Sequence, residues 1–192
     1  MNKIIVLFGF SGSGKSTIAN QIGSNYNLRV IHPSGILRDL YEGKTVDLEN
    51  TRYNTGFWES NDGIRLFKSR LDKDIPLDVL SDRILLNEVA KGNVVIDTWS
   101  LPWLTNTGLK IYLKADLSVR AQRVSKRSNI SYESALDIVN MKDDETRCLF
   151  QRIYGFDIRN DDVFDLVLDT NKISQEQVFR VVCGFVEEYF IN

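Results

Sequence analysis

The chain has 192 residues, of which 43% are hydrophobic and 26% are charged, and its formal net charge is −2 at pH 7. This length suits one α/β domain with a sizeable core. The nearly balanced charge excludes a general electrostatic surface for nucleic acid, which would need a marked basic excess. The N-terminal apolar run is too short for a signal peptide, and no stretch reaches membrane-spanning length. We therefore expect a cytoplasmic protein that binds neither nucleic acid nor a membrane.

Apolar runs alternate with helical patterns along the chain, which predicts a parallel sheet with helices on both faces. The predicted strands are residues 3–8, 28–31, 93–97, 109–114 and 165–169. The predicted helices are residues 15–25, 34–42, 57–72, 77–91, 116–128, 132–154 and 174–190. Residues 43–60 are polar and lack a clear period, so we expect a mobile connection there.

A glycine-rich segment follows the first predicted strand. Residues 9–17 read Gly-Phe-Ser-Gly-Ser-Gly-Lys-Ser-Thr, which fits the phosphate-binding pattern G-x-x-x-x-G-K-[ST]. The alternative is a glycine-rich turn that merely caps a helix. A buried strand before the segment and a helix after it supply the context that the phosphate-binding loop (P-loop) demands, and they favour that interpretation.

The residue types in this loop match what a bound triphosphate requires. Its glycines let successive backbone N–H groups point inward, and the loop ends at a helix N-terminus, where free N–H groups and the helix dipole favour an anion. Lys15 would reach the β- and γ-phosphates, and the Ser16 hydroxyl would ligate Mg²⁺. The predicted nucleotide-binding residues are Gly9, Ser11, Gly12, Ser13, Gly14, Lys15, Ser16 and Thr17.

Asp97 ends the third predicted strand, at the edge of a parallel sheet where ligands bind. Its carboxylate could orient Mg²⁺, hold a phosphate acceptor, or be an ordinary residue of a strand-terminal turn. Trp99 and Trp103 lie on either side of Pro102 just after it, and their rings could stack on a nucleobase or cap the core. For His32, the single histidine, we expect a structural role.

The helix predicted over residues 116–128 carries a cluster of arginines. At 100° per residue, Arg120, Arg123 and Arg127 fall within about 60° of one another, beside an apolar stripe. They therefore lie at the rim of the buried face and can point into a cleft, where cations would neutralise charge on a transferring phosphoryl group. The alternative is a solvated basic face.

With these features in place, the chain resembles the short archaeal-type cytidylate kinases of the nucleoside monophosphate kinase group. The resemblance is clearest in residues 9–17, 36–40, 91–97, 113–123, 126–127, 153–158 and 165–170. It implies the three-layer P-loop fold, with a five-stranded parallel sheet. One domain over residues 1–192 would combine a core (1–32, 92–119 and 155–192) with an acceptor-binding insertion (about 33–91) and a lid (about 120–154). Lid closure would exclude water that could hydrolyse the nucleotide.

The resemblance also implies an activity, the Mg²⁺-dependent transfer of the ATP γ-phosphoryl group to CMP or dCMP. Small nucleotides would be the partners of a monomer or homodimer. The resemblance implies that Arg38 binds the acceptor phosphate and that Arg123, Arg127 and Arg147 belong to the lid. Together with the residues singled out above, the predicted catalytic residues are Lys15, Arg123, Arg127 and Arg147. The predicted acceptor-binding residues are Arg38, Asp97, Trp99 and Trp103, and the predicted Mg²⁺ ligands are Ser16 and Asp97.

Several positions depart from the pattern of that family. Residues 32–35 read His-Pro-Ser-Gly in place of a serine-small-glycine-acidic run, and Trp99 stands where an arginine usually follows the third strand. Lys142 and Leu149 stand where lid arginines are usual. Two alternatives therefore stay open: a P-loop kinase for another nucleotide or small metabolite, and a nucleotide-binding protein with little transferase activity. The chain lacks the Asn-Lys-x-Asp run of a guanine-reading switch.

Overall fold

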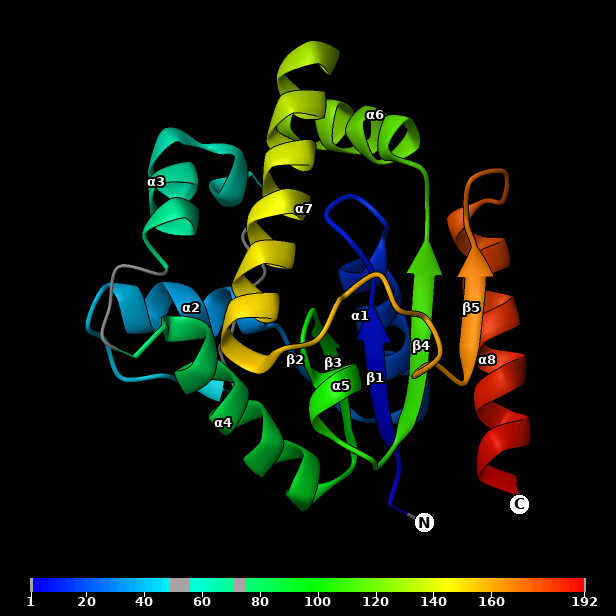
Figure 1. The fold of residues 1–192 in the computed structure, drawn as a ribbon. Coiled ribbons are helices and arrows are strands. Elements are labelled where there is room, and N and C mark those ends of the chain that lie inside the picture. The colour runs from blue at the N-terminus through cyan, green and yellow to red at the C-terminus, as the bar shows by residue number, and fades with distance from the viewer. Residues whose placement is uncertain (1, 49–55, 71–74, 192) are drawn as a thin grey trace.

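The computed structural model describes residues 2–48, 56–70 and 75–191. A parallel sheet with the strand order β2-β3-β1-β4-β5 runs through the middle of the molecule (Figure 1). The strands are β1 (Ile4–Phe8), β2 (Arg29–Ile31), β3 (Val94–Thr98), β4 (Leu109–Lys114) and β5 (Leu166–Asp169). The helices are α1 (Lys15–Tyr26), α2 (Pro33–Tyr41), α3 (Asn61–Ser69), α4 (Leu77–Lys91), α5 (Leu101–Leu104), α6 (Leu117–Ser128), α7 (Tyr132–Tyr154), α8 (Gln175–Ile191) and the short 3₁₀ helix η2 (Phe57–Glu59).

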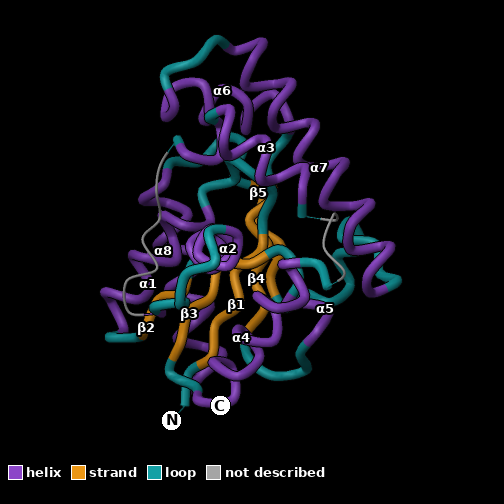
Figure 2. Tube along the Cα trace, turned by 90° about the vertical axis from the view of Figure 1, so that its left-hand side faces the viewer, coloured by secondary structure: helices purple, strands orange, loops and turns teal. Residues whose placement is uncertain are grey.

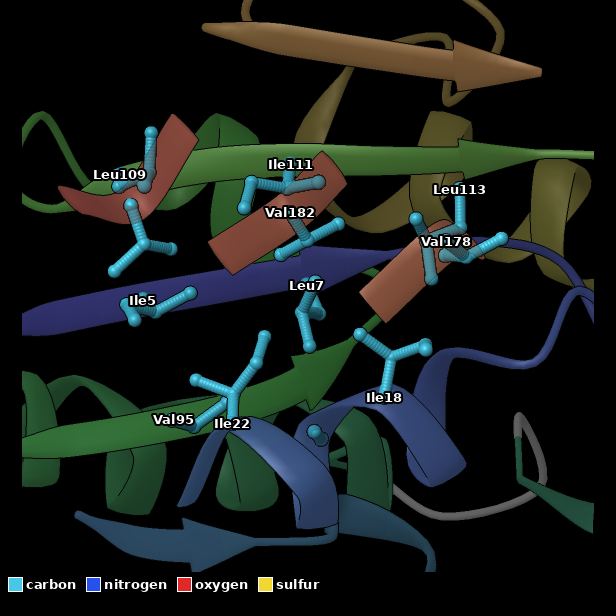
Figure 3. Close-up of a cluster of buried hydrophobic side chains, with 12 residues drawn as sticks. Ile5, Leu7, Ile18, Ile22, Val95, Leu109, Ile111, Leu113, Val178 and Val182 are labelled. Atoms are coloured by element: carbon cyan, nitrogen blue, oxygen red, sulfur yellow. The ribbon is translucent and has the colours of Figure 1, made fainter. Parts of the chain in front are cut away.

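Successive apolar side chains of β1 point to opposite faces of the sheet, which explains why helices cover both faces. Ile5 and Leu7 point to one face, where they pack with side chains of α1 and α8 (Figure 3). Val6 points to the other face and packs with α2, α4 and α5, while Phe8 packs with α7. Burying one such side chain contributes about 2 kcal/mol, so both faces need a helical layer. The predicted α/β fold with a five-stranded parallel sheet is confirmed.

The carboxyl ends of the strands all meet at one edge of the sheet. There, α3, α6 and the N-terminal part of α7 lie beyond the strand ends (Figures 1 and 2). In the register, Leu7 pairs with Asp97, which brings the end of β3 next to the loop that follows β1. The fold therefore gathers the chemically promising segments of the sequence at one edge.

Two parts of the structure differ from the predicted elements. The helix predicted over 57–72 is broken, because Ser60 ends η2 and begins α3, accepting a hydrogen bond from the Gly63 amide at 3.2 Å. Helix α5 was not predicted, because four residues are too few to show a period. Of the connection predicted over 43–60, residues 49–55 lie outside the described residues, as do residues 71–72 of the broken helix. No described helix is long and apolar enough to cross a membrane.

Candidate active site

A cavity of about 390 Å³ lies at the carboxyl ends of β1 and β3. Its walls come from the P-loop, from η2 and α2–α4, from the residues after β3, and from α6 and α7. The sequence-predicted residues that line it are Ser11, Gly12, Gly14, Lys15, Ser16, Thr17, Asp97, Trp99 and Arg127. One cavity thus joins the predicted donor site to elements that lie far along the chain.

The backbone of the P-loop depends on glycine at two positions. Gly12 and Gly14 have φ angles of 84° and 95°, a region that other residues rarely adopt. A Cβ on Gly12 would lie 2.6 Å from the carbonyl oxygen of Arg120. Gly14 is the N-cap of α1 and provides no side-chain cap, so the first N–H groups of α1 are available to a phosphate.

Lys15 shares the cavity with Asp97 and Trp99. Its Nζ lies 5.5 Å from the centre of the Trp99 ring, and the Trp99 indole N–H donates to the Gly9 carbonyl at 3.0 Å. Burial lowers the pKa of Lys15, while Asp97 opposes that shift and Arg127 adds to it. An ammonium in such a dry site attracts phosphate oxygens more strongly than one in water does.

Asp97 is 5% exposed and has a neighbour in His32. The His32 Nδ1 lies 3.1 Å from the Asp97 Oδ2, and the Nε2 lies 3.0 Å from the Asn20 Oδ1. His32 therefore links Asp97 to helix α1, in keeping with the structural role expected for it. Ser16, in the first turn of α1, lines the same cavity. A carboxylate and a hydroxyl beside a phosphate site are oxygen ligands of the kind that Mg²⁺ prefers, so these residues fit the ion.

Two cations from α6 and α7 meet one carboxylate inside the cavity. The Glu59 Oε1 lies 3.1 Å from the Arg127 Nη2 and 2.8 Å from the Lys142 Nζ, and the Glu59 side chain is only 4% exposed. Burial alone would raise the pKa of Glu59, but Lys142 and Arg127 hold it below the usual value. Burial lowers the pKa of Lys142, and Glu59 opposes that shift. Ion pairs thus join the cations of α6 and α7 to η2.

Two further arginines of α6 donate hydrogen bonds to backbone carbonyls of the P-loop. Arg120 donates to the Ser11 carbonyl at 3.2 Å and forms a bidentate pair with Asp143. Arg123 donates to the Ser13 carbonyl at 3.3 Å and to the Thr170 carbonyl at 2.6 Å. Neither arginine lines the cavity. Both arginines therefore hold the backbone of the P-loop.

Outside the P-loop and α6, three predicted site residues do not line the cavity. Arg38 pairs with Glu42 at 3.4 Å. Arg147 is 41% exposed and lies 3.4 Å from Asp144. Trp103 stacks on the Phe156 ring at 5.0 Å within an aromatic cluster of the core, as the core-capping interpretation predicts. Trp99 therefore lines the cavity, whereas Trp103 does not.

Several polar residues that line the cavity were not predicted from the sequence. Asp82 accepts hydrogen bonds from the Ser100 hydroxyl and from the Tyr154 hydroxyl, and burial raises its pKa to about 7. One signal was available, because the polar residues of α4 interrupt an otherwise apolar buried stripe at helical spacing. The missed polar lining residues include Glu59, Arg70, Asp78, Ser81, Asp82 and Ser100.

The chain is similar to several known proteins. Residues 4–172 match the model of the Cytidylate kinase-like family. A cytidylate kinase of Ignicoccus hospitalis is 32% identical over 181 residues, covering 93% of this chain and 96% of that protein. An uncharacterized protein from Eubacterium ventriosum has a similar structure, with a TM-score of 0.67 at 13% identity over 98% of this chain and 99% of that one. For a shikimate kinase from Bacteroides thetaiotaomicron the TM-score is 0.58 at 16% identity, with all of both chains covered. These two structures support the fold alone, whereas the match over residues 4–172 shows that the chain belongs to the cytidylate kinase-like family.

Proposed function

We propose that the protein transfers the γ-phosphoryl group of ATP to CMP or dCMP, with Mg²⁺ as its cofactor. The observation that carries this proposal is that one cavity is lined by the P-loop, by the cations Arg127 and Lys142, and by polar side chains of α4. The family match gives the class of reaction, and the named relative is a cytidylate kinase. We also propose that the protein works in the cytoplasm on free nucleotides, as a monomer or homodimer.

The donor half of the mechanism rests on the P-loop. Its N–H groups and Lys15 bind the β- and γ-phosphates, and Arg123 holds the loop carbonyl of Ser13 in place. Ser16 and Asp97 are the residues that would hold Mg²⁺, which supplies further neutralisation of phosphate charge when bound. Arg127 and Lys142 face the cavity from the lid, where they offset negative charge on the transferring oxygens.

The transfer itself needs little proton chemistry. An oxygen of the acceptor phosphate is already a competent nucleophile; it bonds to the γ-phosphorus while the bond from that phosphorus to the β,γ-bridging oxygen breaks, which leaves ADP. The cavity residues therefore act by position and charge. Arg38 and Arg147 can join them only if nucleotide binding draws them inward, which is the lid role that the resemblance implies for Arg147.

We assign the acceptor to the part of the cavity that α4 lines, which we call the acceptor end. Aromatic rings and polar side chains of α4 both line the cavity. Its aromatic lining residues are Trp58, Phe67, Trp99 and Phe150. A planar base with hydrogen-bonding edges suits such a lining.

One observation favours a second candidate, a P-loop kinase for a different small molecule. Trp99 stands at the end of β3 where the family usually has an arginine, so one expected contact to the acceptor phosphate is missing. An acceptor without a phosphate group would not need that contact. The same assay distinguishes the two candidates.

The test is a measurement of ADP formation from Mg·ATP with a panel of CMP, dCMP, UMP, AMP, nucleosides and sugars. We expect turnover with CMP or dCMP. Lys15→Ala protein, purified in parallel, controls for contaminating kinases. Turnover with a different acceptor would favour the second candidate, and confirmed ATP binding without acceptor-dependent turnover would contradict both.

A further inference from the structure

Two polar side-chain atoms at the acceptor end of the cavity have no hydrogen-bond partner among the described residues. They are the Oδ2 of Asp78 and the Oγ of Ser81, on residues that are 5% and 2% exposed. Both residues line the cavity. Buried polar atoms are nearly always paired, and leaving one unpaired costs about 1–3 kcal/mol. A molecule that enters the cavity can supply the missing partners.

Arg70 fixes the orientation of the Asp78 carboxylate. The Arg70 Nη1 donates to the Asp78 Oδ1 at 3.0 Å, the Nε donates to the Phe67 carbonyl at 3.0 Å, and the guanidinium lies 3.7 Å from the centre of the Phe67 ring. Arg70 also opposes the rise in the pKa of Asp78 that burial causes. With Oδ1 engaged by Arg70, Oδ2 is the oxygen left for a ligand.

Asp78 and Ser81 face the ligand together. They stand at positions i and i+3 of α4, which places their Cβ atoms about 5–6 Å apart on one face of the helix. The pair therefore presents a fixed hydrogen-bond acceptor beside a hydroxyl that can donate. A ring edge with an amino group next to an unprotonated nitrogen is its complement.

Cytosine has that edge, with the N4 amino group beside the N3 acceptor, whereas uracil reverses it with O4 beside an N3–H. We propose that Asp78 and Ser81 form the base-reading site of the acceptor subsite and select cytosine over uracil, an inference that rests on the proposed nucleotide acceptor. Asp78 accepts from the amino group, and Ser81 donates to N3. Arg70 is a positioning residue, because it acts through Asp78. With uracil, O4 would face the carboxylate and leave two acceptors without a donor.

Asp78→Asn reverses the polarity of this site. Because Arg70 can only donate, it holds the new amide oxygen on its own side, and the amide nitrogen takes the place of Oδ2 as a donor. We expect the ratio of kcat/KM for CMP to kcat/KM for UMP to fall about 100-fold, since a site built to hydrogen-bond one edge rejects the other. Ser81→Ala should lower the same ratio about 10-fold, and the KM for ATP should stay the same in both variants.

Asp137→Asn, at an exposed position of α7, is the matched control, and thermal melting checks that each variant is folded. Calorimetric binding of CMP and of UMP is measured alongside turnover. If wild-type protein turns over CMP but neither variant changes the ratio, the inference fails while the proposed function stands. If wild-type protein binds CMP over UMP without turnover and the variants lose this preference, the proposed function fails and the inference stands. Absence of binding by either nucleotide overturns the inference. Should Asp78→Asn fail to fold, Ser81→Ala gives the same decision.

Discussion

The donor end of the cavity is made largely of backbone, whereas its acceptor end is made of side chains. Phosphate binding at the P-loop depends on N–H groups whose directions are set by glycine conformations at Gly12 and Gly14. At the acceptor end, Asp78 and Ser81 come from α4, Arg70 directly follows α3, and Glu59 comes from η2. A backbone site tolerates few substitutions because most residues cannot adopt its conformation. A side-chain site can change its ligand through a single substitution, so specificity can change while the donor stays ATP.

The largest effect should come from Lys15→Ala, which removes the P-loop cation. We expect kcat to fall at least about 1,000-fold, or about 4 kcal/mol. The melting temperature should be almost unchanged, because burial disfavours the charged form of Lys15 and so adds nothing to the stability of the fold. Lys126→Ala, at an exposed position of α6, is the control and should keep full activity. A Lys15→Ala variant with near-normal kcat would remove the P-loop from the mechanism.

Gly12→Ala tests whether the donor end depends on backbone conformation. Its φ of 84° strains an alanine, and the new Cβ would lie 2.6 Å from the Arg120 carbonyl, so the free energy of unfolding should fall by about 3 kcal/mol. Gly43→Ala has a similar strain, at a φ of 66°, but meets no atom within 4 Å. Denaturant unfolding of both variants separates the close contact from the strain. Equal losses would show that contact with Arg120 is unimportant.

Glu59→Gln tests the ion pairs that join η2 to Arg127 of α6 and Lys142 of α7. Lys142 would remain buried without its counter-ion, so we expect unfolding to become easier by about 2 kcal/mol. Because Glu59 opposes the lowering of the Lys142 pKa, its loss should move the alkaline fall of kcat to lower pH. Glu176→Gln, exposed in the first turn of α8, is the matched control. An unmoved pH profile would mean that the charge on Lys142 does not serve turnover.

The smallest effect should come from Asp82, whose pKa burial raises to about 7. The folded state binds this proton more tightly than the unfolded state does, so the stabilisation is greatest at low pH and is lost as pH rises through 7. Between pH 6 and pH 8 the free energy of unfolding should fall by roughly 1 kcal/mol from this group. Thermal melting of Asp82→Asn at both pH values should show a smaller difference than wild-type protein. An equal or larger difference would contradict the shifted pKa.

The contrast between a backbone site and a side-chain site also explains which features could be predicted from the sequence. Strand and helix periods, the P-loop spacing and Asp97 at a strand end are local patterns, and the sheet brought them together as expected. The partners of long side chains are not local. Arg123 and Arg127 share a face of α6, yet one contacts the Ser13 carbonyl and the other contacts Glu59, across elements whose packing no sequence period specifies. Trp99 and Trp103 likewise have different surroundings, because α5 begins between them and only Trp99 lines the cavity.

The carboxylate of Glu59 has a consequence for the pace of turnover. Its single negative charge sits between the two positive charges of Arg127 and Lys142, so the cluster keeps one net positive charge. Such a cluster attracts a phosphate less strongly than two free cations would. Tight binding of both substrate and product slows an enzyme once it is saturated, because only contacts that strengthen in the transition state raise kcat. Because Glu59 weakens the attraction of Arg127 and Lys142 for the phosphates of bound substrate or product, it should favour rapid release of the product over high affinity.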